Sequence, residues 1–541
     1  MNKRKYEFYD NPRVDSIVEL IERASDLYGD SVAIRYKQNK VLNEKTYNEL
    51  LLDSKNIAKY LLNQPFQKGH IAILGSSSYE WITTYLGTVF AGLVIVPLDK
   101  ELPANELVDL IMQADVECLF YDEQYANVVD TFIEKFNLNI SFVSMNKLYS
   151  LTYNEKSIPG VVPDKLSTIL FTSGTTGKSK GVMLTQKNIA SNVIQGLGAV
   201  NLQHRKDIIM SVLPMNHAYE FTCTILGMLY KGVTICISSG LRYLQKELIE
   251  YKPTVMFIVP LFAETLYKKV ELNIKKQKKE KAFAMAVKFN NFFNKLHIDL
   301  TDKLFKEIKE AFGGRLRIIM CGGAPLSENL IQKYNDIGIN LFQGFGLTEC
   351  SPLLTVNFDY YHRPNSVGKV VSGNEVKVVD SEIWARGISV SKGYYNNPIE
   401  TSKSFEDGWF KTGDLGYIDK DDFVFIIGRK KNLIILDNGK NVSAEELEKY
   451  IYEIPCVCEV IVYGENNRIV AEICVEPEKH HISNDELNNE INKINKKLPT
   501  YKNIDKVIIR DVPFEKTTTK KIKRYYSCDS CSATSGCGQD T

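Results

Sequence analysis

Helical and strand-like hydrophobic patterns alternate along the first part of the chain. Apolar residues recur at helical spacing over residues 14–28, and residues 32–36 then alternate between apolar and polar as a half-buried strand does. Residues 46–62 return to the helical pattern, with Thr46 as the predicted N-cap and Glu49 three positions later, which is the spacing of a capping box. Helices and strands in alternation predict an α/β domain with a largely parallel sheet.

The hydrophobic pattern changes twice towards the C-terminus. Residues 367–387 are rich in strand-like segments, which predicts a β-rich subdomain, and beyond Asn432 a second, smaller set of helices and strands begins. A chain of 541 residues is too long for a single hydrophobic core. The predicted parts are a large α/β domain over residues 1–430, a small α+β domain over residues 431–524 and a disordered, cysteine-containing tail over residues 525–541.

One loop concentrates hydroxyl groups, glycines and lysines between two predicted strands, residues 167–171 and 181–184. Glycines let a backbone approach a ligand closely, and successive backbone N–H groups form an anion-binding concavity. We therefore expect the loop to bind a polyphosphate, and the alternative is a surface hairpin loop of turn-forming residues. The predicted phosphate contacts are Thr172, Ser173, Gly174, Thr175, Thr176, Gly177, Lys178 and Lys180.

The same loop departs from the Walker A motif, which has the form Gly-x-x-x-x-Gly-Lys-Ser/Thr and leads into a helix. Gly177, Lys178 and Ser179 fit this motif, but Thr172 stands where its first glycine belongs. The segment that follows, residues 181–184, has the pattern of a strand rather than of a helix. The helix predicted next, over residues 186–196, begins after Thr185 as its N-cap. These differences disfavour a nucleotide site of the P-loop type.

Further candidate site residues follow predicted strands elsewhere. His217 comes after the strand at residues 208–213, where ligands of open α/β sheets bind, although a loop histidine bonded to its own backbone is the alternative. Glu349 offers the carboxylate oxygen that Mg²⁺ prefers, and a helix N-cap pair with Thr348 is a compatible structural role. Two glycine-rich turns after strands make a slot for a flat aromatic ring, formed by Gly322, Gly323, Ala324, Gly344, Phe345 and Gly346.

These motifs, in this order, resemble those of the adenylate-forming, AMP-binding superfamily, which includes acyl-CoA synthetases, peptide-synthetase adenylation domains and luciferases. The resemblance extends over residues 11–524. It rests on the phosphate loop, on Gly-Phe-Gly-Leu-Thr-Glu ending at Glu349, on Thr-Gly-Asp ending at Asp414, on Gly-Arg-x-Lys ending at Lys431 and on a terminal motif with Lys521. Phrases such as Asn-His-Ala-Tyr-Glu are similar to bacterial long-chain acyl-CoA synthetases.

The resemblance implies a role for each candidate residue. Lys521 would be the catalytic lysine, Thr348 would bond the α-phosphate, Glu349 would hold Mg²⁺, and His217 would border the acyl tunnel. The two glycine-rich turns would hold the adenine, and the small domain would be mobile. Asp414, which stands in a predicted turn, and Arg429 would bind the ribose. Lys431 would be the hinge, and Gly439 would lie beside the thiol tunnel.

The implied reaction is ATP-dependent activation of a carboxylic acid as an acyl-adenylate, followed by transfer to a thiol. The leading expectation is a medium-chain or long-chain fatty acid:CoA ligase, with ATP, Mg²⁺ and CoA as cofactors. One alternative is a ligase that loads an acyl or aryl acid onto the phosphopantetheine of an acyl carrier protein. Another alternative is a non-catalytic nucleotide-binding protein, and the presence of Glu349, Asp414, Arg429 and Lys521 weighs against it.

Composition and charge narrow the range of partners. The formal net charge is +1, so no global field attracts nucleic acid. The charged N-terminus and the broken apolar stretch at residues 81–98 predict a cytoplasmic protein without a signal peptide or transmembrane segment. We expect the lysine-rich residues 268–311 to form a solvated helical face, with weak contact to anionic lipid as the alternative. Cys528, Cys531 and Cys537 have only partial metal-binding spacing.

Overall fold

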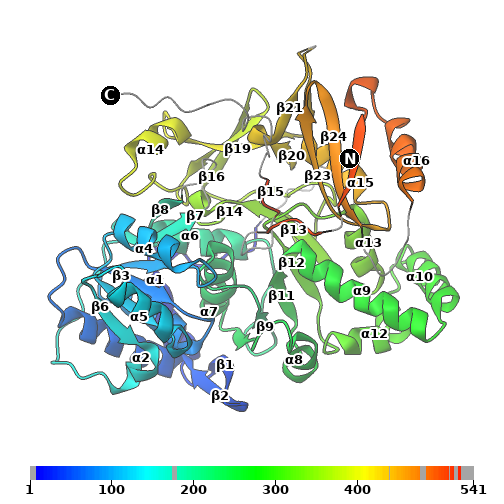
Figure 1. Ribbon diagram of the computed structural model, residues 1–541. Coiled ribbons are helices and arrows are strands. Elements are labelled where there is room, and N and C mark those ends of the chain that lie inside the picture. The colour runs from blue at the N-terminus through cyan, green and yellow to red at the C-terminus, as the bar shows by residue number, and fades with distance from the viewer. Residues whose placement is uncertain are drawn as a thin grey trace, which may run out of the picture. The chain divides into compact units, whose positions relative to one another are not determined.

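The chain forms two compact units, Met1–Ile426 and Ile427–Thr541, which are described separately (Figure 1). The computed structural model describes residues 8–172, 179–437, 439–475, 483–510, 512–516 and 522–524. The predicted domain boundary at residue 430 lies close to the division between the units. Within the described residues, no helix is both long and apolar enough to cross a membrane.

The first sheet of the large unit is parallel except for its last pair of strands. Ile71 and Ile73 point into one hydrophobic core and Ala72 and Leu74 into another, so helices cover both faces of this sheet. The strands, in spatial order, are β6 (Ser141–Ser144), β5 (Cys118–Tyr121), β3 (His70–Leu74), β4 (Val94–Pro97), β7 (Leu166–Thr172) and β8 (Lys180–Thr185).

The second sheet has a parallel centre and antiparallel edges. Its two faces also belong to different hydrophobic cores, because Ile319 packs in one and Ile318 in the other. The strands, in spatial order, are β15 (Lys369–Val370), β14 (Leu353–Val356), β13 (Asn340–Gly346), β12 (Ile318–Cys321), β11 (Val255–Ile258), β9 (Ile208–Ser211), β10 (Thr234–Ile237), β1 (Val32–Gln38) and β2 (Val41–Thr46).

One hydrophobic core is shared by the two sheets. It contains the buried faces of α1 (Ile17–Tyr28), α3 (Tyr79–Phe90) and α6 (Gln186–Leu197). Helix α6 packs against β7 of the first sheet and β14 of the second. The other helices of the large unit are α2 (Tyr47–Leu62), α4 (Ala104–Gln113), α5 (Ala126–Glu134), α7 (Gly227–Lys231), α8 (Leu244–Tyr251), α9 (Pro260–Lys276), α10 (Glu280–Asn294), α11 (Thr301–Leu304), α12 (Lys306–Ala311), α13 (Glu328–Asp336) and α14 (Pro398–Ser404).

Local capping explains where several helices begin. The predicted capping box at Thr46 and Glu49 is confirmed at the start of α2. The predicted cap at Thr185 is also confirmed, because its hydroxyl accepts the backbone N–H of Asn188 at 3.0 Å at the start of α6. These short-range hydrogen bonds satisfy N–H groups that the helix itself leaves unbonded.

A third, antiparallel sheet completes the large unit, and the predicted β-rich subdomain is confirmed by it. Four of its strands are, in spatial order, β16 (Asn374–Val379), β17 (Glu382–Gly387), β19 (Trp409–Ile418) and β18 (Phe405–Glu406), and the fifth, β20 (Val424–Arg429), also pairs with β19. The chain then passes along β20 into the small unit. The small unit contains β21 (Leu433–Ile435), β22 (Asn441–Ser443), β23 (Val457–Glu465), β24 (Arg468–Val475), β25 (Lys506–Arg510), α15 (Ala444–Ile451) and α16 (Asn484–Asn495).

Two predicted turns prove to be parts of strands. Gly344 to Gly346 continue β13 and pair with β14, instead of forming a glycine-rich turn after a shorter strand. A Cβ atom on Gly346 would lie 2.0 Å from the carbonyl oxygen of Pro352, so glycine is required by close approach of the two backbones. Asp414 lies within β19, at a register shift against β17, rather than in a turn.

Candidate functional site

The carboxyl ends of four parallel strands bring several predicted site residues to one edge of the nine-stranded sheet. These strands are β9, β11, β12 and β13. Cys321 pairs with Gln343, so Gly322 and Gly344 directly follow paired positions on neighbouring strands. His217 follows the end of β9 at the same edge, which is where ligands of open α/β sheets bind. The predicted adenine-binding segments therefore lie side by side.

A tyrosine ring packs over the first of these segments. Tyr219 begins a π-helix, η3 (Tyr219–Leu226), and its hydroxyl donates a hydrogen bond to the carbonyl oxygen of Met320 at 3.0 Å. A Cβ atom on Gly322 would lie 3.4 Å from the Tyr219 ring, which is an ordinary van der Waals contact, so the backbone at Gly322 packs against the ring. Burial raises the pKa of Tyr219 well above its usual value, which keeps the hydroxyl a neutral donor.

His217 lies in the turn that leads into η3. Its backbone N–H donates to the carbonyl oxygen of Pro214 at 3.2 Å, and its own carbonyl accepts the N–H of Phe221 at 3.1 Å. The residue is half-buried, and its place beside an acyl tunnel stays a prediction.

A fully buried carboxyl group supports the same turn. Glu220 accepts hydrogen bonds from the hydroxyls of Ser211 at 2.5 Å and Thr224 at 3.0 Å, and backbone N–H groups of Val212 and Leu213 also bond it. Burial nevertheless raises the pKa of Glu220 to about 8, because these hydrogen bonds only partly offset desolvation. Ser211, Val212 and Leu213 precede the His217 turn and Thr224 follows it. The Glu220 carboxyl therefore connects the end of β9 to η3.

The predicted phosphate loop connects two antiparallel strands, as expected from the sequence. Thr172, the last residue of β7, pairs with Lys180, the first residue of β8. Residues 173–178, with the predicted contacts Ser173, Gly174, Thr175, Thr176, Gly177 and Lys178, lie outside the described residues. The strand after the loop excludes the helix that a Walker A motif requires.

Lys180 is buried and engaged by two groups from a distant segment. Its ammonium forms an ion pair with Glu400, and it also lies 5.2 Å from the centre of the Tyr394 ring. The hydrogen bonds from Lys180 and Lys403 lower the pKa of Glu400 to about 2. This lysine is thus held at a fixed position at the base of the loop, and a direct phosphate contact by it stays a prediction.

Tyr394 connects this ion pair to the predicted metal-binding carboxylate. Its hydroxyl donates to the Oε1 atom of Glu349 at 2.9 Å. The tyrosine is aligned by β8, because Val182 forms an antiparallel bridge with it and Gly181 accepts the N–H of Tyr395 at 2.8 Å. Burial raises the pKa of Tyr394, and the nearby charge of Glu349 raises it further, so its hydroxyl remains a donor.

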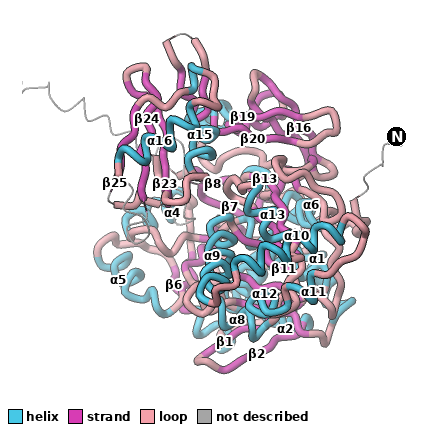
Figure 2. Tube along the Cα trace, turned by 90° about the vertical axis from the view of Figure 1, so that its right-hand side faces the viewer, coloured by secondary structure: helices cyan, strands magenta, loops and turns pink. Residues whose placement is uncertain are grey.

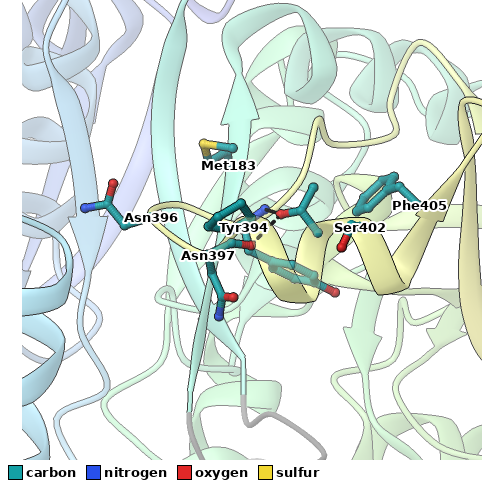
Figure 3. Close-up of a pocket in the computed structure, with 8 residues that line it drawn as sticks. Met183, Tyr394, Asn396, Asn397, Ser402 and Phe405 are labelled. Carbon is teal, nitrogen blue, oxygen red and sulfur yellow. Dashed lines mark hydrogen bonds between the residues drawn. The ribbon is translucent and has the colours of Figure 1, made fainter.

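A shallow hollow lies beside Tyr394, between β8 and α14 (Figure 3). All eight residues that line it are outside the set predicted from the sequence. In Figure 3, Met183 lies on the β8 side, Ser402 and Phe405 lie on the α14 side, and Asn396 points away from them. The lining residues are Met183, Tyr394, Asn396, Asn397, Pro398, Thr401, Ser402 and Phe405.

Thr348 and Glu349 form the single turn η4 (Thr348–Cys350), which packs against β8. The backbone carbonyl of Glu349 accepts the N–H of Ser391 at 2.7 Å. Among the described residues, Tyr394 is the group that bonds the Glu349 carboxylate, and it uses one of the two oxygens. The chemistry of the remaining oxygen fits a magnesium ion, which prefers carboxylate ligands.

The predicted ribose ligand Asp414 lies near this turn. Burial raises the pKa of the Cys350 thiol well above its usual value, and the charges of Glu349 and Asp414 raise it further, so both carboxylates lie close to this thiol. The register shift that positions Asp414 is held by Glu382, whose carboxylate accepts the N–H of Gly413 at 3.0 Å.

The small unit contains the remaining predicted site residues. Arg429 ends β20, and Lys431 lies exposed in the turn η5 (Lys430–Asn432). Gly439, with φ of 75°, occupies the exposed turn between β21 and β22, where its left-handed backbone favours glycine. A Cβ atom on Gly428 would lie 2.4 Å from the Ser443 hydroxyl, so the chain passes too close there for a side chain.

The chain segments on the two sides of the predicted catalytic lysine pair with each other through backbone hydrogen bonds. Lys516 and Ile522 form an antiparallel bridge, and the N–H of Lys523 donates to the carbonyl oxygen of Glu515 at 2.8 Å. Lys521 itself lies outside the described residues, as does the tail at residues 525–541. The described part of the chain contains no group of three or more His, Cys, Asp or Glu side chains arranged for a metal ion.

Sequence reasoning did not identify Tyr394, Glu400, Tyr219 or Glu220 as parts of the site. A local signal existed for one of them, because Asn397 precedes a proline and stands three positions before Glu400, which is typical of a helix start. The structure has Asn397 as the N-cap of α14, accepting the Glu400 N–H at 3.1 Å. Nothing in the sequence near Asn397 or Glu400 indicates that this segment lies beside the phosphate loop.

Two family models match the chain. The model described as AMP-binding enzyme matches residues 21–395, and the model described as AMP-binding enzyme C-terminal domain matches residues 431–530. The chain belongs to the AMP-binding enzyme family. The predicted superfamily and the predicted α/β fold with a separate C-terminal domain are both confirmed.

The chain is also similar to individual relatives in sequence and to solved structures in fold. Long-chain-fatty-acid–CoA ligase FadD15 of Mycobacterium bovis is 29% identical over 440 residues, which cover 75% of this chain and 73% of the relative. Long-chain-fatty-acid–CoA ligase 5 of Rattus norvegicus is 28% identical over 518 residues, covering 86% and 76%. The structure of ATP-bound MatB from Rhodopseudomonas palustris matches with a TM-score of 0.77 and 24% identity, covering 93% and 97%; this likeness concerns the fold.

Replacement of Glu220 by glutamine should remove a pH dependence of stability. The pKa of the unfolded carboxyl is near the ordinary glutamate value of 4.5, whereas the pKa of the folded carboxyl is about 8 because the group is buried. Its contribution to stability is therefore complete below pH 4.5 and is lost as the pH rises to about 8. Between about pH 5 and pH 8, the wild-type melting temperature should fall by about 3 °C more than that of Glu220→Gln.

The control for this prediction is Glu134→Gln, which changes an exposed glutamate of α5. Thermal melting is followed by fluorescence in one buffer series. Parallel pH profiles for the wild-type protein, Glu134→Gln and Glu220→Gln would contradict a raised pKa for Glu220.

Proposed function

We propose that this protein is an AMP-forming acid–CoA ligase that activates a medium-chain or long-chain fatty acid. The family membership and the relatives named long-chain-fatty-acid–CoA ligases support this function. The observation that carries it is the junction of β8, Tyr394 and Glu349 at the base of the phosphate loop, with Asp414 close by. Such a junction suits a nucleotide whose phosphates and ribose must be held together.

Acid activation requires cations placed before the reaction begins. The substrate carboxylate attacks the α-phosphorus of ATP, forms an acyl-adenylate and releases pyrophosphate, while negative charge grows on the phosphate oxygens. Lys521 supplies positive charge there, Thr348 bonds the α-phosphate, and the loop at residues 172–180 holds the pyrophosphate. Glu349 would hold Mg²⁺, which neutralises phosphate charge when bound.

The second half-reaction needs a different arrangement of the small unit. The thiol of CoA attacks the acyl carbonyl, the acyl–phosphate bond breaks and AMP leaves. Lys431 acts as the hinge, and Gly439 borders the thiol route once Lys521 has withdrawn. Adenine lies against Gly322 to Ala324 and Gly344 to Gly346, with Asp414 and Arg429 on the ribose. A cytoplasmic location and an acyl carrier protein as acceptor stay predictions.

A substrate screen tests the proposed function. Pyrophosphate release is measured with ATP and Mg²⁺ over fatty acids of increasing length and over aryl acids, with CoA or with loaded carrier protein as the acceptor. We expect fatty acids of medium or long chain to be turned over with CoA. Turnover confined to aryl acids, or turnover only with carrier protein, would contradict the proposal, and so would the absence of pyrophosphate release with every acid.

Replacement of Lys521 by alanine should abolish adenylate formation while ATP binding largely survives. We expect the rate of pyrophosphate release to fall by at least about 1,000-fold, because the growing phosphate charge loses its cation. The matched controls are Lys520→Ala and Lys523→Ala, which remove neighbouring lysines of the same segment. Pyrophosphate release by Lys521→Ala that is as fast as that of the controls would refute the assigned role.

Replacement of Tyr394 by phenylalanine tests Glu349 as the magnesium ligand. The change removes the hydroxyl that holds the Glu349 carboxylate. We expect the Mg²⁺ concentration for half-maximal adenylation to rise about tenfold, as for loss of a hydrogen bond to a charged group. Tyr395→Phe is the matched control, because that hydroxyl bonds the carboxylate of Asp115 at 2.8 Å instead. Equal magnesium dependence in both variants would speak against this role.

A further inference from the structure

Helix α10 exposes a stripe of large apolar side chains. Met285, Phe289 and Phe292 are spaced by four and three residues, and Leu296 continues the stripe just beyond the helix end. Their exposed fractions are 67%, 50%, 60% and 56%. Residues at this spacing lie on one face of a helix, so the four side chains form a continuous surface.

This exposed stripe is not the face by which α10 joins the fold. Phe283, Ala286 and Val287 lie on another side of the helix and pack against the hydrophobic core on the outer face of the nine-stranded sheet. Asn290 on that side is fully buried. The helix therefore has two apolar faces, of which the fold uses one. Figures 1 and 2 place α10 at the periphery of the large unit, next to α9.

Lysines border the stripe along one side. Lys281, Lys288 and Lys295 recur every seven residues and are exposed, which places them on the helix flank next to the stripe. Within the described parts of the chain, these three lysines form no ion pair. Residues 275–295 contain seven lysines and one glutamate, so the whole region is strongly basic.

We propose that α10 and the lysine-rich turn before it form a docking surface for an anionic lipid bilayer. An apolar stripe beside a row of lysines is the arrangement of helices that lie in a membrane interface. The aromatic side chains reach the acyl boundary, and the lysines contact anionic headgroups. A protein partner suits this surface less well, because lysine is depleted from protein–protein interfaces. The proposal is independent of the proposed catalytic function.

Vesicle sedimentation of the full-length protein tests this surface without any substrate. The probes are phosphatidylcholine vesicles and vesicles that contain about 30% phosphatidylglycerol, at about 0.15 M salt. We expect binding to the anionic vesicles, and we expect Phe289→Ser/Phe292→Ser to weaken it at least about tenfold. Lys281→Gln/Lys288→Gln/Lys295→Gln should weaken binding to anionic vesicles by at least about tenfold, since each lysine contributes about fivefold, and should not affect neutral vesicles.

Matched controls distinguish binding through this surface from nonspecific binding of exposed apolar or basic side chains to vesicles. Leu52→Ser/Met112→Ser removes two equally exposed apolar side chains from α2 and α4, and Lys135→Gln/Lys147→Gln/Lys420→Gln removes three exposed lysines elsewhere. Unchanged melting temperatures show that each variant is folded. The proposal fails if the wild-type protein does not bind anionic vesicles, or if the controls lose as much binding as the α10 variants. It also fails if light scattering shows a dimer that Phe289→Ser/Phe292→Ser dissociates, because a second copy then covers the stripe.

Discussion

The hydrogen bond from Tyr394 to Glu349 is the centre of a network that joins three segments far apart in the sequence. Tyr394 is aligned by β8, its ring lies near the Lys180 ammonium, and Lys180 in turn is paired with Glu400. A lysine buried to this degree is tolerated only when it is paired, so Glu400 fixes its position. The predicted metal ligand and the base of the phosphate loop are therefore oriented by one polar network.

Extended strands also hold two other predicted parts of the site in place. A predicted glycine-rich turn is the end of β13, held against β14 by a backbone approach that only Gly346 allows. Asp414 lies in β19, where the Glu382 carboxylate holds the shifted register. Side chains on paired strands keep their geometry better than side chains on free loops. The predicted nucleotide-binding residues on these two strands are therefore held in place before any ligand binds.

Features that depend on residues close together in the sequence could be predicted from it. Contacts between residues far apart in the sequence could not. The cap at Thr185 and the strands beside the phosphate loop depend on residues within a few positions, so the pattern alone predicts them. The environment of Lys180 depends on Glu400, a partner 220 positions away. Glu220 is buried because η3 folds back on β9, which no periodicity reveals. The order of the motifs predicted the superfamily because the motifs consist of the residues that carry out the chemistry. Their identity can be recognised without knowing how the chain packs.

In the small unit, charged and polar side chains connect the neighbour of the predicted hinge residue to the end of the terminal motif. Arg524 donates to Glu448 at 2.5 Å and lies 3.8 Å from Glu445, whose carboxylate also accepts the Asn432 side chain at 2.5 Å. Asn432 is the neighbour of the predicted hinge residue Lys431, and Arg524 follows the bridge that flanks residues 517–521. A rotation at Lys431 would therefore carry Arg524, at the described end of the terminal motif, with it. That coupling is what an enzyme needs if one lysine must be present for adenylation and absent for thiol attack.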